Sequence, residues 1–117
     1  MSFSWKDYLD LARELSHKAG EASARSAISR AYYAAYQAAR RHPGCKGAVP
    51  TKSGSHSAVW RALRESGNKD WRKAGNQGRD ILEYRGEADY DDHVPELTRK
   101  MHSTVRMAEE IMQILGA

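Results

Sequence analysis

Arg85 stands out among the side chains that could do chemistry, because it continues an otherwise apolar helix face. That face is predicted from residues at helical spacing that lead up to this arginine: Trp71, Ala74, Gly75, Gly78, Ile81 and Leu82. Charged groups are rarely buried without a partner. We therefore expect Arg85 either to bind an anion such as phosphate, or to act as a structural anchor. As an anchor it would pair with Asp89 four residues later or bind helix-end carbonyls.

Histidines and acids near Arg85 extend the list of candidate groups. His93 follows Arg85 after seven intervening residues and could move protons, since an imidazole titrates near neutral pH. His56 begins a predicted helix on its inward side, so we expect a core or capping histidine there. The acids Asp89, Asp91 and Asp92 suit a hard cation by type, but they lack the spacing of a calcium-binding loop. We expect neither a metal site nor a cofactor.

Aromatic residues are concentrated on one predicted helix. Tyr32 and Tyr36 are four residues apart and share a face, whereas Tyr33 points elsewhere. Tyr33 and Tyr90 could stack on nucleotide bases, and Arg30 could supply a second phosphate contact beside Tyr33. The alternatives are that Tyr33 packs in the core or in a dimer interface, and that the Tyr90 ring covers a helix end.

These side chains must be positioned by helices, because no segment alternates convincingly between polar and apolar residues. Helical spacing and the Gly, Pro and Asn breakers predict five helices, over residues 5–18, 21–41, 56–65, 69–85 and 95–115. Ser4 is expected to cap the first helix, and Pro95 to open the last. The sequence therefore predicts an all-α fold, a compact up-down bundle of four to five helices in one domain over residues 1–117.

The bulk composition favours a small globular protein of the reduced cytoplasm. The chain has 117 residues, of which 40% are hydrophobic, and this is enough to form one core. Its net charge is +4. Its N-terminus does not resemble a signal peptide, no apolar run approaches membrane-span length, and the single cysteine, Cys45, cannot form an intramolecular disulfide. The positive charge favours anionic partners such as RNA, and it is concentrated in a basic segment that includes Lys46 and Lys52.

Two segments resemble the HEPN family of prokaryotic helical-bundle proteins. They are RSAISRAYYAAY at residues 25–36 and YRGEADYD at residues 84–91, and the helix start GSHSAV at residues 54–59 is also similar. The resemblance covers nearly the whole chain and implies a bundle that commonly forms a homodimer. Many members are metal-independent endoribonucleases, and several are toxins paired with a nucleotidyltransferase antitoxin or effectors of antiviral defence.

The resemblance implies specific roles for the residues that match the family's motif. Arg85 would stabilise the negative charge that builds on the phosphorane oxygens as the ribose 2′-OH attacks, and His93 would be the general acid–base. Asp89 would orient the arginine, because a carboxylate beside an arginine is a weak base at neutral pH. The family's usual histidine is closer to the arginine than His93 is, and this chain carries the Arg-x3-Asp-Tyr form instead. The alternative is a non-catalytic HEPN module that binds nucleotides or a partner protein such as a nucleotidyltransferase. A helical bundle unrelated to nucleic acid is a third interpretation.

Overall fold

The fold is all-α, as predicted. The computed structural model describes residues 3–45 and 55–117, and within these ranges it contains no strand. The helices are α1 (Lys6–Ser16), α2 (Glu21–Arg40), the short 3-10 helix η1 (Pro43–Cys45), α3 (Ser55–Arg64), α4 (Lys69–Tyr90) and α5 (Leu97–Ile114). None of the helices in this part of the chain combines the length and the hydropathy of a membrane span. Lys46 and Lys52, in the predicted basic segment, lie outside the described residues.

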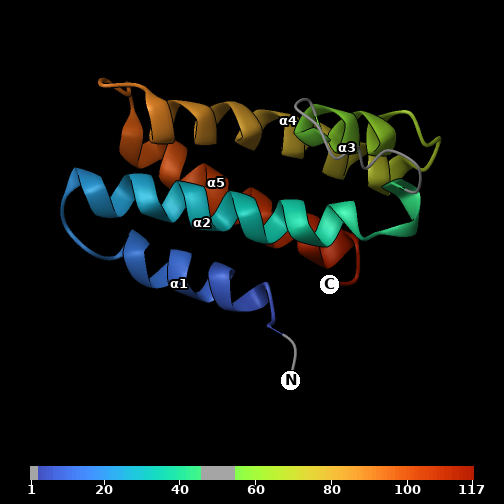
Figure 1. Ribbon diagram of the computed structural model, residues 1–117, viewed down its shortest axis with the longest axis horizontal. Coiled ribbons are helices and arrows are strands. Elements are labelled where there is room, and N and C mark those ends of the chain that lie inside the picture. Colours follow the sequence, from blue (N-terminus) through green and yellow to red (C-terminus); the bar gives the residue numbers. More distant parts are fainter. Residues whose placement is uncertain (1–2, 46–54) are drawn as a thin grey trace.

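Helix α2 is the centre of the bundle, because small side chains let its neighbours approach closely. In Figure 1 it runs between α1 and α4, with α5 behind it. It packs against α1, α4 and α5 along most of its length and touches α3 near its end. Its buried side chains are mainly alanines, with larger residues between them: Ala24, Ala27, Ile28, Ala31, Tyr32, Ala34, Ala35, Tyr36 and Ala39. The alanine face therefore serves packing within the monomer.

Two glycines in α4 allow α3 to pack directly against that helix. A Cβ on Gly78 would overlap the Trp60 indole ring, and one on Gly75 would lie 2.7 Å from the backbone oxygen of Trp60. The indole ring fills this space and is fully buried. These contacts fix the position of α3, and with it the position of His56 at its first turn.

The predicted end of α4, the predicted start of α5 and one predicted cap differ from those in the structure. Helix α4 does not end at Arg85 but continues to Tyr90, so Asp89 and Tyr90 are helical. Helix α5 begins at Leu97, not at Pro95, since Glu96 adopts a left-handed conformation with φ 54° just before it. The capping role predicted for Ser4 is also wrong, because the residue before α1 is Trp5 and no side chain caps the helix.

The guanidinium of Arg25 explains why α4 extends past Gly86. It donates hydrogen bonds from α2 to the carbonyl oxygens of Ala88 at 3.1 Å and Asp92 at 3.0 Å, and a third to the carbonyl of Asp91. Carbonyls at a helix C-terminus have no partner within the helix, so an arginine beside them stabilises the last turn. The consequence is a rigid last turn that presents Asp89 and Tyr90.

Candidate functional site

Arg85 is held against aromatic rings on the side of α4 that faces α2. Only 12% of its side chain is exposed. The guanidinium carbon lies 5.4 Å from the ring centre of Tyr32, 5.6 Å from that of Tyr33 and 6.0 Å from that of Tyr90. Such contacts stabilise a cation but leave its N–H groups without acceptors. The prediction that Arg85 lies on the inward face is thus confirmed.

The donors of this guanidinium are almost entirely unused. Arg85 makes no hydrogen bond to any residue in the ranges 3–45 and 55–117, and its Nε is buried without a partner. A guanidinium carries five N–H donors, and a buried donor without an acceptor is unfavourable by about 1–3 kcal/mol. These donors are available to an acceptor that the described residues do not supply.

Asp89 lies beside Arg85 but does not satisfy it. The two side chains form an ion pair at 3.6 Å across one helical turn, which is longer than a charge-assisted hydrogen bond. The same carboxylate oxygen is 3.5 Å from the Ser29 hydroxyl on α2. With 28% of its side chain exposed, Asp89 lies at the rim of the site. At this position the carboxylate can orient Arg85, as predicted, and it also adds negative charge that an incoming phosphate would meet.

His56 is the histidine that the fold brings to this site. Its Nδ1 lies 2.7 Å from the Tyr32 hydroxyl, and its ring stacks on Tyr36 with the ring centres 3.9 Å apart. It also contacts the rings of Tyr32 and Tyr33, both of which contact Arg85. Burial lowers the pKa of His56, and the positive charges of Arg85 and Arg40 lower it further.

Tyr32 and Trp60 complete a chain of hydrogen bonds behind His56. Trp60 Nε1 donates to the Tyr32 hydroxyl at 3.1 Å. Burial strongly raises the pKa of Tyr32, so its hydroxyl keeps its proton at neutral pH. The sequence predicts a core or capping histidine at His56 and indicates no role for it beside Arg85. The orientation of His56 depends on Tyr32 from α2, which is distant from it in sequence, and on Trp60 from α3. The one feature of the sequence that indicates a role is its place on the inward face of the helix.

Arg30 lies next to this site across a shallow cavity. The cavity has a volume of about 400 Å³ between α2 and the end of α4, and its polar lining comes from Arg25, Ser26, Ser29, Arg30 and Asp89. Arg30 is exposed on α2, with its guanidinium carbon 5.1 Å from the ring centre of Tyr8. A second cation thus lies beside Asp89, as a second phosphate contact requires.

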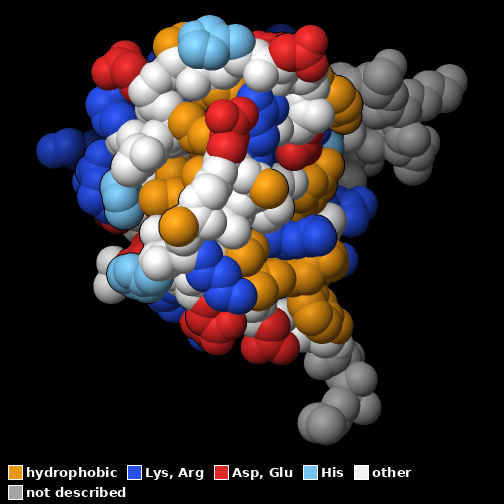
Figure 2. Space-filling model, turned by 90° about the vertical axis from the view of Figure 1, so that its left-hand side faces the viewer, with side chains coloured by type: hydrophobic (Ala, Val, Ile, Leu, Met, Phe, Trp, Pro, Cys, Tyr) orange, Lys and Arg blue, Asp and Glu red, His pale blue; other side chains and the backbone are white. Residues whose placement is uncertain are grey.

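Tyr90 and His93 are both on the surface near the end of α4. Tyr90 is 77% exposed, so most of its surface faces solvent. His93 is exposed in the connection between α4 and α5 and makes no hydrogen bond within the described residues. Figure 2 views this end of the bundle, where basic, acidic and histidine side chains are interspersed with hydrophobic ones. Of the predicted site residues, the structure groups Arg85, Asp89, Tyr33 and Tyr90 together, with Arg30 adjacent and His93 on the surface beyond them.

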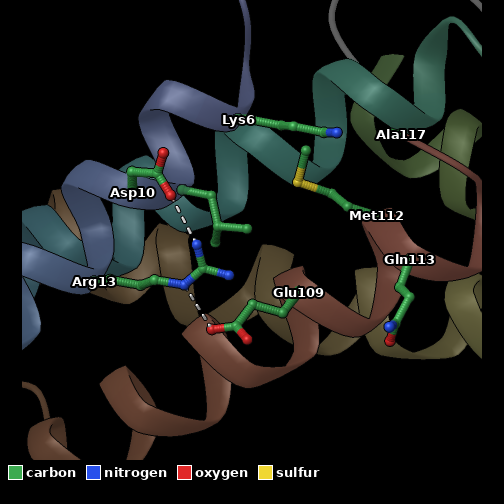
Figure 3. Close-up of a pocket in the computed structure, with 8 residues that line it drawn as sticks. Lys6, Asp10, Arg13, Glu109, Met112, Gln113 and Ala117 are labelled. Carbon is green, nitrogen blue, oxygen red and sulfur yellow. Dashed lines mark hydrogen bonds and ion pairs between the residues drawn. The ribbon is translucent and has the colours of Figure 1, made fainter.

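A second cavity, between α1 and α5, provides a contrast (Figure 3). It has a volume of about 320 Å³, and Arg13 lies at its edge. This guanidinium donates to Asp10 at 2.8 Å and to Glu109 at 3.2 Å, so two carboxylates satisfy it. Arg13 is therefore hydrogen-bonded to two carboxylates, whereas Arg85 has only the ion pair with Asp89 at 3.6 Å among the described residues.

The acids Asp89, Asp91 and Asp92 do not gather into a metal-ligand group, nor do any other three His, Cys, Asp or Glu side chains of the described residues.

Comparisons with known proteins give no further guide to the site. No protein-family model, curated protein or solved structure was found to match this chain.

Proposed function

We propose that this chain is a HEPN-like, RNA-acting protein that binds an RNA phosphate at Arg85 and cleaves the neighbouring bond without a metal ion. The observation that carries the proposal is the mostly buried guanidinium whose donors have no acceptor among the described residues. Arginine pairs with phosphate through two parallel hydrogen bonds, which would supply those acceptors. As the adjacent 2′-OH attacks phosphorus and the P–O5′ bond breaks, negative charge builds on the non-bridging phosphate oxygens, and Arg85 would stabilise that charge.

The aromatic surroundings favour a nucleic acid over a free inorganic anion. The half-buried Tyr33 and the exposed Tyr90 flank the guanidinium, and base stacking on such rings is favourable for any base. Arg30 offers a second cation for the next phosphate along the strand. The net charge of +4 also favours association with a polyanion.

The biological setting follows from the HEPN resemblance alone and is part of the proposal. A homodimer would bring two copies of Arg85 to one groove. The activity would be that of a toxin or a defence effector, and its partner a nucleotidyltransferase antitoxin. Sedimentation of the purified chain tests the first point, since the monomer has a mass of 13.2 kDa and a dimer twice that.

RNA cleavage in the presence of EDTA tests the enzymatic proposal. We expect wild-type protein to cleave, and Arg85→Ala to lose about 100-fold in rate, in line with the loss of a transition-state donor. Arg79→Ala is the matched control, because Arg79 is an exposed arginine of the same helix, paired with Asp80. If neither protein cleaves, or if Arg85→Ala cleaves like the wild type, the chain is not an Arg85-dependent ribonuclease.

A non-catalytic role in binding nucleotides is the second candidate. It is favoured by the placement of His93 on the surface and by the ion pair between Arg85 and Asp89 at the rim of the site. This role predicts that nucleotides raise the melting temperature of the wild type but not of Arg85→Ala, with no cleavage by either protein. Cleavage that depends on Arg85 would exclude it.

A further inference from the structure

The hydrogen bonds around Tyr32 define which nitrogen of His56 carries a proton. The Trp60 indole N–H can only donate, so the Tyr32 oxygen accepts from it at 3.1 Å. The Tyr32 hydroxyl, which stays protonated, must then direct its own hydrogen to an acceptor. The only one in contact with it among the described residues is His56 Nδ1, at 2.7 Å. Nδ1 is therefore the acceptor, and Nε2 carries the proton of a neutral imidazole.

The surroundings of His56 oppose a second proton. An imidazolium would donate from Nδ1 to the Tyr32 oxygen, which already accepts from Trp60, and the hydroxyl hydrogen would lose its acceptor. The charged groups that face the ring are Arg85 from α4 and Arg40 from α2, and both are cations. The remaining contacts are the tyrosine rings of α2, which offer no carboxylate. This geometry therefore keeps the His56 imidazole neutral, with Nε2–H as its donor.

The Nε2–H group is the unsatisfied part of the ring. His56 is half-buried, and within the described residues its Nε2 has no hydrogen-bond partner. The ring shares its contacts to Tyr32 and Tyr33 with Arg85, whose own donors are also unused. Two unfilled donor groups thus adjoin the same two tyrosines.

We propose that His56 is the histidine that acts beside Arg85, and that it donates Nε2–H to a non-bridging oxygen of an internal RNA phosphodiester. The inference rests on the proposed role of Arg85 as a phosphate ligand and deepens it. Arg85 supplies the charge, and His56 adds one directed hydrogen bond that does not depend on protonation of the ring. His56 is therefore a phosphate-binding residue and not the proton-transfer group of the reaction.

The first test is the tautomer itself, measured by ¹⁵N NMR of the histidine side chains in the free protein. At pH 7.5 we expect His56 Nε2 to carry hydrogen and Nδ1 to carry none, with the Nε2 signal shifting when a 2′-O-methyl RNA oligonucleotide is added. A hydrogen on Nδ1, or an Nε2 signal that RNA at saturation does not move, would overturn the proposal. His93 serves as an internal reference for an exposed ring.

The second test uses two amides that each replace one imidazole nitrogen. His56→Gln places an N–H donor near the position of Nε2, whereas His56→Asn can accept from Tyr32 but has no donor at that position. We expect the affinity for the non-cleavable oligonucleotide, made without terminal phosphates, to fall about tenfold for His56→Asn and no more than about threefold for His56→Gln, the range of one hydrogen bond. Equal affinities for the two variants, whether normal or reduced, would overturn the proposal.

The same titration separates this inference from the proposed function. If Arg85→Ala binds the oligonucleotide as tightly as the wild type, the phosphate site itself is refuted. If Arg85→Ala loses affinity while His56→Asn does not, only the role of His56 is refuted. Tighter binding of a nucleoside 5′-monophosphate than of the oligonucleotide would instead identify a free phosphate group as the ligand, and would overturn the assignment to a phosphodiester.

Discussion

Among single residues, Arg85 differs from Arg13 and Arg25 in how its guanidinium is satisfied. Arg13 and Arg25 satisfy their guanidinium groups with carboxylates or helix-end carbonyls, while Arg85 has three tyrosine rings and one ion pair at 3.6 Å. An arginine with a purely structural role is expected to have a hydrogen-bond acceptor within about 3 Å, because a buried donor without an acceptor is unfavourable. The arrangement supports the proposal that a ligand supplies the missing acceptor.

Asp89 provides a prediction at this scale. Its carboxylate lies next to the guanidinium and repels an incoming phosphate, so Asp89→Asn is expected to tighten RNA binding about three- to tenfold at low salt. Asp80→Asn is the matched control, because it makes the same change of charge on the same helix near Arg79. Fluorescence anisotropy with labelled RNA provides the measurement. Weaker binding by Asp89→Asn, with Asp80→Asn unchanged, would mean that the carboxylate is needed to hold Arg85 in position.

The sequence indicated part of this site and missed the rest, for physical reasons. Arg85 and Asp89 could be paired because helical spacing puts residues four apart on one face. The orientation of His56 could not be read in the same way, since it depends on Tyr32, 24 residues away, and on Trp60 behind it. The exposure of Tyr90 depends equally on where α4 ends, and Arg25 determines that from another helix.

At the scale of helices, the glycines of α4 have opposite roles. Gly78→Ala forces a methyl group into the Trp60 ring and should lower the free energy of unfolding by about 1–3 kcal/mol. At Gly86, near the C-terminal end of the same helix, an added Cβ meets nothing within 4 Å. Gly86→Ala should therefore raise the free energy of unfolding by about 0.5–1 kcal/mol. Urea denaturation of both variants tests this contrast. A stable Gly78→Ala protein would show that α3 does not pack against α4 as described.

The sequence predicts the presence of each helix more reliably than it predicts where each helix ends. Apolar periodicity identified all five helices, because each buries one continuous stripe. The sequence predicts an early end for α4 because glycine commonly ends helices. The helix continues through Gly86 because Arg25 from α2 donates hydrogen bonds to carbonyls at its C-terminus. The start of α5 was misplaced because Pro95 fits a first turn equally well, and the left-handed Glu96 is a tertiary feature.

At the scale of the whole molecule, two histidines make stability depend on pH. Burial lowers the pKa of both His42 and His56 in the folded state, so the unfolded chain binds more protons below the ordinary histidine value of about 6.5. The free energy of unfolding is then flat above about pH 7 and falls as the pH drops below about 6.5. Urea denaturation at pH 7.5 and pH 5.5 measures this loss. His56→Asn should reduce it, and greater stability at pH 5.5 would contradict the burial of these rings.

Binding of a non-cleavable 2′-O-methyl RNA oligonucleotide tests whether RNA completes the anion site at Arg85. Arg85→Ala is expected to weaken binding about tenfold or more, since hydrogen bonds to charged groups contribute about 1.5–3 kcal/mol. Arg79→Ala, which removes the same charge from an exposed position of the same helix, should bind within about twofold of the wild type. Circular dichroism establishes that both variants are folded. Equal affinities for folded Arg85→Ala and Arg79→Ala would contradict the account.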